Sequence, residues 1–304
     1  MKHVVAVAIP AAIAVLTTAL GAQQRTTREF KPARSGYAAV NGINYYYEIY
    51  GSGAPLLLLH GGLGSIEMFR PILPALAKGR QIIAVDLQGH GKTALGDRPI
   101  SVIDMGNDLA IVVKQLGYDT VDVLGYSLGG GVALRLAIQH PEVVRRAVFV
   151  STPYAQNGFY PEMLPQQAAV SAALADQMKD TPMYKSYVAV APRPQDFPRL
   201  LDRMGEYMRQ PFDWAEDVKK LKGPVMLVYG DADMVRPEHI VSFYQLLGGG
   251  LKDAGWQREH MSHNRLAILP NLTHYEVFMS PGLAPTVLPF LNGETTAPVW
   301  AGAH

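Results

Sequence analysis

The stretch Gly125-Tyr126-Ser127-Leu128-Gly129 decides the fold of this chain. It has the pattern G-x-S-x-G, and it lies between an apolar run at 121–124 and a helical pattern at 128–139. A serine on a sharp turn from a buried strand into a helix projects its hydroxyl into solvent, and the flanking glycines let the turn form without a Cβ clash. The pattern in this setting predicts that Ser127 is a nucleophile.

The composition is that of a globular protein with one large α/β domain or two smaller ones. Of 304 residues, 48% are hydrophobic and 17% are charged. The 27 basic and 26 acidic side chains leave a net charge of +1, which indicates neither nucleic acid nor an anionic membrane surface as a partner. The chain has no cysteine, so disulfides are excluded and a metal site would need histidine and carboxylate ligands. We expect no metal and no cofactor, and the oligomeric state is left open.

The first 22 residues have the layout of a secretory signal peptide. The basic start Met1-Lys2-His3 is followed by an almost wholly apolar run from 4 to 20 and then by small residues. The alternative is an uncleaved membrane anchor, although the run is short for a membrane span. We therefore expect a signal peptide at 1–22, a polar linker at 23–34, and a secreted or periplasmic protein with no membrane partner after cleavage.

Apolar runs and helical patterns alternate along the rest of the chain. Asn41-Gly42 is a tight-turn signal inside a predicted hairpin at 35–50. Six buried strands are predicted at 55–60, 81–86, 121–124, 146–150, 225–229 and 266–269, and helices at 68–77, 101–115, 128–139, 237–247 and 284–291. The alternation predicts an α/β fold with a mostly parallel central sheet and helices on both faces.

One long segment, 153–222, interrupts this alternation. It holds no convincing strand and several short helical patterns, among them 166–179 and 198–209. An insertion after the fourth parallel strand stands over the carboxyl ends of the strands, where α/β sheets bind their ligands. We predict a helical cap; the alternative is a helical insertion that packs elsewhere. Of its aromatic residues, Tyr154 and Trp214 are candidate substrate contacts.

The predicted cap divides the core into two parts. The first core part is 35–152, the cap is 153–222, the second core part is 223–292, and 293–304 is a tail. A second irregular stretch, 248–264, is a predicted loop with no assigned role.

A nucleophilic serine needs a base that removes its proton, and the base needs an acceptor that orients it. Loops that follow parallel strands emerge at the same edge of the sheet, so the partners of Ser127 should follow later strands. His274 follows the sixth predicted strand and is the predicted base. The rival histidines do not follow a strand; they are His239, His260 and His263. Asp231 and Asp233 both follow the fifth predicted strand, and both are candidates for the acid.

A tetrahedral intermediate needs backbone N–H groups directed at its oxyanion. One candidate donor is Leu128, directly after the nucleophile. The other comes from the glycine-rich loop at 60–64, where we favour Gly62 and keep Leu63 as the alternative. Leu63 is also a candidate substrate contact.

The dense motif from Asp86 to Thr93 has a functional and a structural interpretation. A functional one would make Asp86 and His90 catalytic. We favour the structural one, in which the glycines and polar side chains of 86–93 stabilise a tight loop near the nucleophile turn. Asp108, on a predicted helix, is likewise interpreted as structural.

Together these residues resemble the α/β-hydrolase fold superfamily over about 35–291. The motifs, in chain order, are His60-Gly61-Gly62, 86–93, 125–130, 230–233 and His274. In that family the acid is usually the second aspartate of a G-x-x-D loop, which implies Asp233. The resemblance is closest to the capped esterase, haloperoxidase-like and enol-lactonase-like branches. Ser127 departs from the haloalkane dehalogenase and epoxide hydrolase branches, which have aspartate there, and disfavours both activities.

The predicted triad favours acyl transfer to water through an acyl-serine intermediate. The first hypothesis is a serine hydrolase, a carboxylesterase or lactonase, acting on a small-molecule ester or lactone. A second hypothesis is carbon–carbon bond hydrolysis of a diketone-like substrate by the same triad, and a cofactor-free haloperoxidase or perhydrolase activity is a third. A non-catalytic binding protein on this scaffold is the alternative from a different class.

Overall fold

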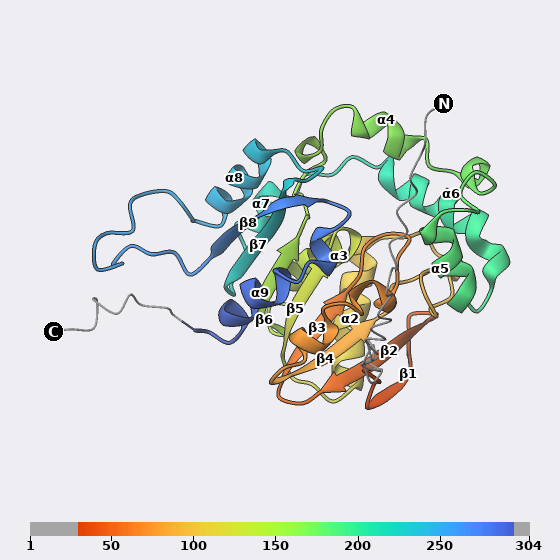
Figure 1. The fold of residues 1–304 in the computed structure, drawn as a ribbon, viewed down its shortest axis with the longest axis horizontal. Coiled ribbons are helices and arrows are strands. Elements are labelled where there is room, and N and C mark those ends of the chain that lie inside the picture. Colours follow the sequence, from red (N-terminus) through yellow and green to blue (C-terminus); the bar gives the residue numbers. More distant parts are fainter. Residues whose placement is uncertain (1–29, 295–304) are drawn as a thin grey trace, which may run out of the picture. The chain divides into compact units, whose positions relative to one another are not determined.

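A mixed sheet of eight strands forms the centre of the structure, a computed structural model that describes residues 30–294 (Figure 1). The strand order is β1-β2-β4-β3-β5-β6-β7-β8; β1 and β2 are antiparallel to their neighbours and the other strands are parallel. The bounds are β1 Arg34–Val40, β2 Ile43–Gly51, β3 Ala54–Leu59, β4 Arg80–Val85, β5 Val121–Tyr126, β6 Val144–Val150, β7 Val225–Ala232 and β8 Arg265–Thr273. The predicted α/β class and mostly parallel sheet are confirmed.

Parts of the sequence prediction lie outside the described residues. These are the signal peptide at 1–22, most of the linker at 23–34 and most of the tail at 293–304. Among the residues that the structure does describe, no helix has both the length and the apolar character that a membrane span requires.

The strands form for two local reasons. The four leucines of β3, from Leu56 to Leu59, are at most 1% exposed because helices cover both faces of the sheet, and such strands are continuous apolar runs. The β1–β2 hairpin turns at Asn41 and Gly42, whose φ values of 48° and 81° are both left-handed. A two-residue turn of this kind matches the strand twist and favours Asn-Gly.

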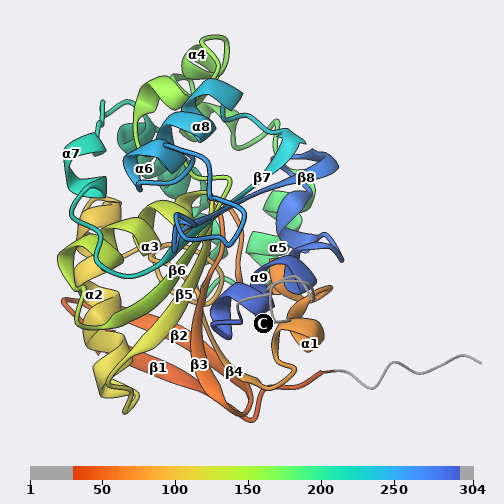
Figure 2. The same cartoon turned by 90° about the vertical axis from the view of Figure 1, so that its left-hand side faces the viewer.

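The helices lie on both faces of the sheet. Figure 2 shows α2 and α3 on one side of the strands and α1 and α9 on the other. The bounds are α1 Leu73–Leu76, α2 Val102–Gln115, α3 Leu128–Gln139, α4 Met163–Ala168, α5 Pro182–Val190, α6 Phe197–Met208, α7 Ala215–Val218, α8 Pro237–Leu246 and α9 Leu283–Leu291. Short 3₁₀ turns occur at Ile66–Phe69, Gln156–Gly158, Ala172–Leu174, Pro194–Asp196 and Val277–Met279.

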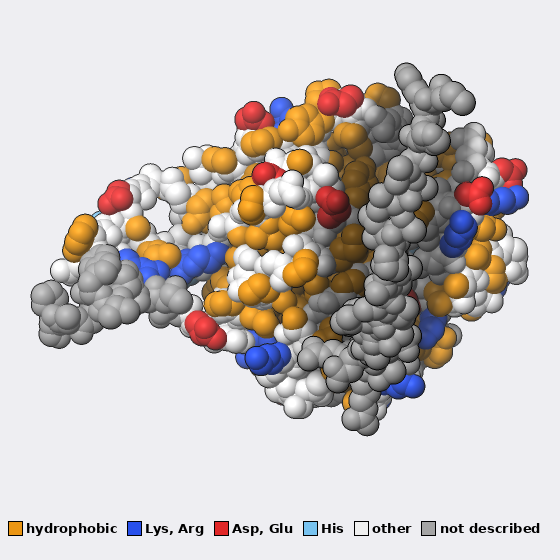
Figure 3. Space-filling model, in the orientation of Figure 1, with side chains coloured by type: hydrophobic (Ala, Val, Ile, Leu, Met, Phe, Trp, Pro, Cys, Tyr) orange, Lys and Arg blue, Asp and Glu red, His pale blue; other side chains and the backbone are white. Residues whose placement is uncertain are grey.

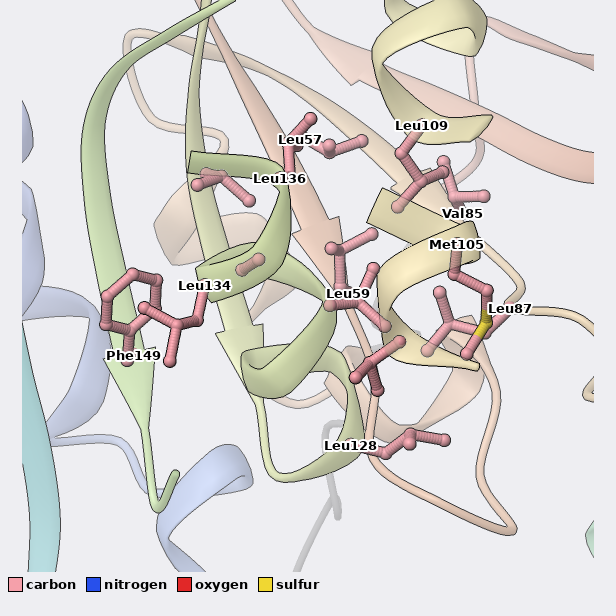
Figure 4. Close-up of a cluster of buried hydrophobic side chains, with 14 of the residues drawn as sticks. Leu57, Leu59, Val85, Leu87, Met105, Leu109, Leu128, Leu134, Leu136 and Phe149 are labelled. Carbon is pink, nitrogen blue, oxygen red and sulfur yellow. The ribbon is translucent and has the colours of Figure 1, made fainter. Parts of the chain in front are cut away.

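The core joins α2 and α3 to the sheet beneath them. In Figure 4, Met105 and Leu109 of α2 and Leu136 of α3 lie close to buried leucines of β3. The helices approach closely at Gly106, where a Cβ would lie 3.0 Å from the backbone N of Leu136. Leu128 belongs to the same buried cluster, so the start of α3 is held by core packing.

Residues 153–222 contribute no strand to the sheet, and α4, α5 and α6 lie together (Figure 1). The single helix predicted at 166–179 is wrong, because α4 ends at Ala168. The reason is a tertiary contact: the carboxylate of Asp202 in α6 accepts the N–H of Ala172 at 2.7 Å. Gly205 lets α6 approach this segment, since a Cβ there would lie 1.9 Å from the carbonyl oxygen of Val170.

Two other predicted elements differ from the structure. The helix predicted at 68–77 is a 3₁₀ turn at Ile66–Phe69 followed by the single turn of α1, because Pro71 and Pro74 have no N–H to donate inside a continuous helix. The strand predicted at 266–269 extends to Thr273 and includes Pro270. Proline is tolerated there because β8 is an edge strand.

Candidate active site

The nucleophile turn joins β5 to α3 through Ser127, whose backbone is strained at φ 52° and ψ −116°. The Ser127 N–H donates to the carbonyl of Val150 at 2.9 Å, which ties the turn to β6. A Cβ at Gly125 would lie 2.2 Å from the carbonyl oxygen of Gly129, and one at Gly129 would lie 2.4 Å from that of His60. Both positions therefore require glycine, as the G-x-S-x-G pattern predicts.

The structure brings together the three residues of the predicted triad. His274 Nε2 lies 3.1 Å from Ser127 Oγ, and His274 Nδ1 lies 3.0 Å from Asp233 Oδ1. The His274 and Asp233 side chains are 7% and 1% exposed, whereas Ser127 is half-buried. Hydrogen bonds of this length in this order place a base against the hydroxyl and an anion against the base.

The two candidate acids have different surroundings. Asp233 Oδ1 faces His274 and accepts the N–H of Val235 at 3.3 Å, and Oδ2 accepts the Gly230 N–H at 3.3 Å. Asp231 is exposed and its Oδ1 accepts the N–H of Leu272 at 3.1 Å. Backbone N–H groups of β8 lower the pKa of Asp231. The geometry thus pairs Asp233 with His274, and Asp231 with the edge strand.

The hydrogen bond of His239 and the exposure of His260 and His263 place the rival histidines away from Ser127. His239 is buried in α8, where its Nε2 accepts the N–H of Tyr154 at 3.2 Å, and burial lowers its pKa to about 4. His260 and His263 are exposed in the loop after α8. That loop, predicted at 248–264, contains no helix or strand.

The loop after β3 carries the candidate oxyanion donors. A Cβ at Gly62 would lie 3.9 Å from Leu128 Cβ, so the two favoured donors lie beside each other. Neither of their N–H groups has a hydrogen-bond acceptor among the residues that the structure describes. Leu63 follows with a left-handed φ of 55°. Two free N–H groups near a nucleophile form the kind of site that stabilises an oxyanion.

Buried polar side chains form hydrogen bonds that hold the glycine-rich loop at 60–64 in place. His60 Nδ1 donates to the Gly61 carbonyl at 2.8 Å and its Nε2 accepts the Leu87 N–H at 3.0 Å. Burial lowers its pKa to about 3, so the ring is neutral. Asp86 accepts the N–H groups of Ile66 and Lys92, each at 2.8 Å. These contacts join 86–93 to the oxyanion loop and fit the structural interpretation of that motif.

The second histidine of this region, His90, and the acid Asp108 also make structural contacts. His90 is fully buried, its Nδ1 donates to the Gln88 carbonyl at 2.8 Å, and burial lowers its pKa to about 4. Asp108 accepts the hydroxyl of Tyr45 at 2.6 Å and forms an ion pair with Arg98. Neither side chain contacts Ser127 in the hydrogen bonds of residues 30–294.

Comparisons with known proteins identify the fold. A family model described as the alpha/beta hydrolase fold matches residues 54–182. The chain has the α/β-hydrolase fold. Over 235 residues it is 27% identical to a protein of Azorhizobium caulinodans assigned as the carbamate hydrolase RutD, covering 72% of this chain and 87% of that one.

Two further matches, one in sequence and one in structure, cover different shares of this chain. A soluble epoxide hydrolase of Corynebacterium sp. is 39% identical over 112 residues, which are 36% of this chain and 38% of that one. The crystal structure of an enol-lactonase from Burkholderia xenovorans superposes with a TM-score of 0.62 at 20% identity, covering 84% of this chain and all of that one. The first match spans little more than a third of either protein, and the second shows the fold.

Two residues that sequence reasoning missed form hydrogen bonds to the predicted triad. The hydroxyl of Tyr126 donates to the carbonyl of His274 at 2.8 Å, and the two rings lie 5.3 Å apart. The hydroxyl of Ser151, just after β6, donates to Asp233 Oδ2. The sequence separations are 148 and 82 residues, so no local pattern could have indicated either contact.

The predicted substrate contacts of the cap have other partners. The ring of Tyr154 stacks on His239 at 4.0 Å, and its hydroxyl lies 2.9 Å from Ser242 Oγ in α8. The ring of Trp214 lies 4.6 Å from that of Phe212 and beneath the guanidinium of Arg135 in α3. These contacts favour a structural role, and a substrate-binding role for either residue stays a prediction.

Helix α6 lies over the candidate oxyanion loop. A Cβ at Gly62 would lie 3.1 Å from Met204 Cε, and Met204 itself is 1% exposed. Figure 3 shows that apolar side chains also gather on the surface over β8 and α9. Tyr275, directly after the triad histidine, is 64% exposed, and Ile268 and Met279 are exposed nearby in the chain. The surroundings of the site are thus largely apolar.

No group of three or more histidine, aspartate or glutamate side chains within residues 30–294 is placed to hold a metal ion.

Proposed function

We propose that this protein is a serine hydrolase that cleaves a small-molecule carboxylic ester or lactone through an acyl-serine intermediate. The observation that carries the proposal is the hydrogen-bonded series from Ser127 through His274 to Asp233, with distances of 3.1 and 3.0 Å. The strained φ of 52° at Ser127 adds support, because strain of this kind is concentrated at functional sites.

In the first half-reaction Ser127 Oγ attacks the carbonyl carbon of the substrate while His274 Nε2 takes its proton. The carbonyl oxygen becomes an oxyanion that accepts hydrogen bonds from the N–H groups of Gly62 and Leu128. His274 then gives its proton to the leaving alkoxide, and the carbon–oxygen bond breaks. Asp233 remains an anion throughout and keeps the proton of His274 on Nδ1.

In the second half-reaction a water molecule takes the place of the alcohol. His274 removes a proton from the water as it attacks the acyl-serine, and then returns a proton to Ser127 Oγ as the acid leaves. In a lactone the alkoxide is part of the same molecule as the acyl group, so the product is a single hydroxy acid.

We further propose that the acyl group is apolar and lies beneath the cap. Support comes from Met204 of α6, which contacts the oxyanion loop, and from Leu128 and Leu63 beside it. The same triad chemistry applies to esters and lactones, which differ in whether the leaving alkoxide stays attached to the acyl group.

The test is hydrolysis of p-nitrophenyl esters from acetyl to dodecanoyl and of several lactones. Ser127→Ala is the blank, and Ser186→Ala, which changes an exposed serine of α5, is the matched control. We expect turnover by wild type and Ser186→Ala and none above background by Ser127→Ala. Turnover that survives in Ser127→Ala would refute the proposed nucleophile, and the absence of turnover on the whole panel would refute the ester and lactone substrates.

We also propose that the protein is exported and that residues 1–22 are removed. The support is the basic, apolar and small-residue layout of that segment. After expression in a Gram-negative bacterium, the periplasmic protein should have the mass of a chain that begins near residue 23. Full-length protein in the membrane fraction would indicate the anchor instead.

A further inference from the structure

A second serine with left-handed backbone lies next to the triad. Ser151 directly follows β6, has a φ of 52° and is completely buried. Its N–H donates to the carbonyl of Val228 in β7 at 2.8 Å, so its backbone is fixed by the neighbouring strand. Ser127 at the end of the adjacent strand β5 has the same φ.

The residue type at this position is unexpected on backbone grounds. A φ of 52° favours glycine, which adopts this region without a Cβ clash, and among other residues asparagine and aspartate tolerate it best. Two of the six non-glycine residues with positive φ in the described part are asparagines, Asn41 and Asn271. A serine in this conformation destabilises the local backbone relative to glycine, so its hydroxyl must offer a compensating advantage.

Among residues 30–294, the hydroxyl of Ser151 has one hydrogen-bond partner, the acid of the triad. Ser151 Oγ donates to Asp233 Oδ2, the oxygen that does not face His274. The other donor to this oxygen is the Gly230 N–H at 3.3 Å, a long hydrogen bond. The ion pairs of the described residues give Asp233 no partner except His274. Ser151 is therefore the main group that fixes the far side of the carboxylate.

We propose that Ser151 is a positioning residue for the reaction proposed above, on which this inference rests. Its hydroxyl holds the Asp233 carboxylate in the rotamer that directs Oδ1 at His274 Nδ1. The proton stays on Ser151 Oγ, and no bond is made or broken there. Without the hydroxyl, the carboxylate can rotate about its χ2 angle, and the orientation of the His274 ring is lost in a fraction of the molecules.

Two variants without the hydroxyl separate positioning from stability. In Ser151→Gly the left-handed backbone is unstrained, whereas in Ser151→Ala the strain remains, so the glycine variant should melt about 2–4 °C above the alanine variant. Both should lose kcat to the same extent, by about 10- to 100-fold, because both lose a hydrogen bond to a charged group. KM should not change, since the buried side chain does not touch substrate.

Activity that follows the melting temperature, with Ser151→Gly close to wild type and Ser151→Ala well below it, would overturn the proposal. Such a result would mean that Ser151 has only a structural role. An unchanged kcat in both variants would overturn it as well.

A spectroscopic measurement keeps this test independent of turnover. The Nδ1 proton of His274 that bonds to Asp233 should give a low-field NMR resonance, assigned by its loss in His274→Ala. We expect both Ser151 variants to shift or broaden this resonance; an unchanged resonance would overturn the inference. If wild type had no Ser127-dependent hydrolysis, the proposed function would fail while the resonance still reported on the Ser151 contact.

Discussion

Replacing Asp233 by asparagine tests the assignment of the acid. The carboxylate has four hydrogen-bond partners: Oδ1 faces His274 Nδ1 and the Val235 N–H, and Oδ2 accepts from Ser151 and the Gly230 N–H. All four can act as donors, so a carboxylate satisfies them all. An asparagine has a single acceptor oxygen, and its NH₂ group must face one of the two pairs.

The expected loss of kcat in Asp233→Asn depends on which of the two pairs of donors the NH₂ group faces. The Ser151 hydroxyl can rotate and accept, but the Gly230 N–H cannot; on the other side His274 can accept at Nδ1 only by moving its proton to Nε2. That tautomer presents an N–H to Ser127 Oγ and cannot serve as its base. In a serine–histidine–aspartate triad such a change lowers kcat by about 10⁴-fold, which is about 5 kcal/mol of transition-state free energy.

The matched control is Asp231→Asn, two residues away in the same loop. Asp231 is exposed and contacts the backbone of β8, so we expect a kcat within about 3-fold of wild type. Initial rates on the best p-nitrophenyl ester, with urea unfolding of each variant, give the comparison. An Asp233→Asn variant that retains a tenth of the wild-type kcat, or equal losses of activity in the two variants, would refute the assignment of Asp233 as the acid.

Three further predictions follow from the same contacts. Gly129→Ala should fail to fold or lose several kcal/mol of stability in urea, because its Cβ would lie 2.4 Å from the His60 carbonyl oxygen; a stable, active variant would contradict the packing. Burial lowers the pKa of His60 to about 3 and of His90 to about 4, below the value of about 6.5 in an unfolded chain. The unfolded chain therefore binds protons first, and the free energy of unfolding should fall below about pH 6.5, by up to ~1.4 kcal/mol per pH unit for each histidine. Asp86 opposes this trend, because burial raises its pKa to about 7 and the folded protein then holds more protons than the unfolded chain between about pH 4 and 7. Urea unfolding at pH 5, 6 and 7 measures the net effect on the free energy of unfolding. A free energy of unfolding that rises toward pH 5 would contradict the prediction that the histidines dominate. Met204→Ala should shift the optimum of the ester panel toward longer acyl chains, because Met204 contacts the oxyanion loop, and an unchanged optimum would place the acyl group elsewhere.

The fold could be predicted from sequence because its signals are local. The turn at Ser127 needs glycine on both sides, the strand β3 is a continuous apolar run, and Asn41-Gly42 specifies a hairpin turn. Each of these depends on residues within about ten positions of one another. The convergence of Ser127 and His274 then followed from topology, since the carboxyl ends of parallel strands share one edge of the sheet.

What could not be predicted depends on contacts between distant segments. The family resemblance implied Asp233, but the residues by themselves left Asp231 and Asp233 open, because the β7–β8 register shifts between Gly230 and Ala232 and no local pattern indicates that shift. The predicted helix at 166–179 is interrupted by Asp202, some 30 residues later. Such contacts override local helix propensity, which is a weak preference.

The site receives residues from the sheet and from helix α6, and these two parts should affect the reaction differently. Ser127 and Ser151 directly follow the neighbouring strands β5 and β6, and the N–H of each donates to the next strand, at Val150 and Val228. The strained backbone that carries the chemistry is thus held by the sheet, where a small movement would break ladder hydrogen bonds and core packing together. Helix α6 has no such constraint, since it contacts the site through flexible side chains such as Met204. Substitutions in the sheet should therefore change kcat on every substrate alike, whereas substitutions in α6 should change the ranking of substrates.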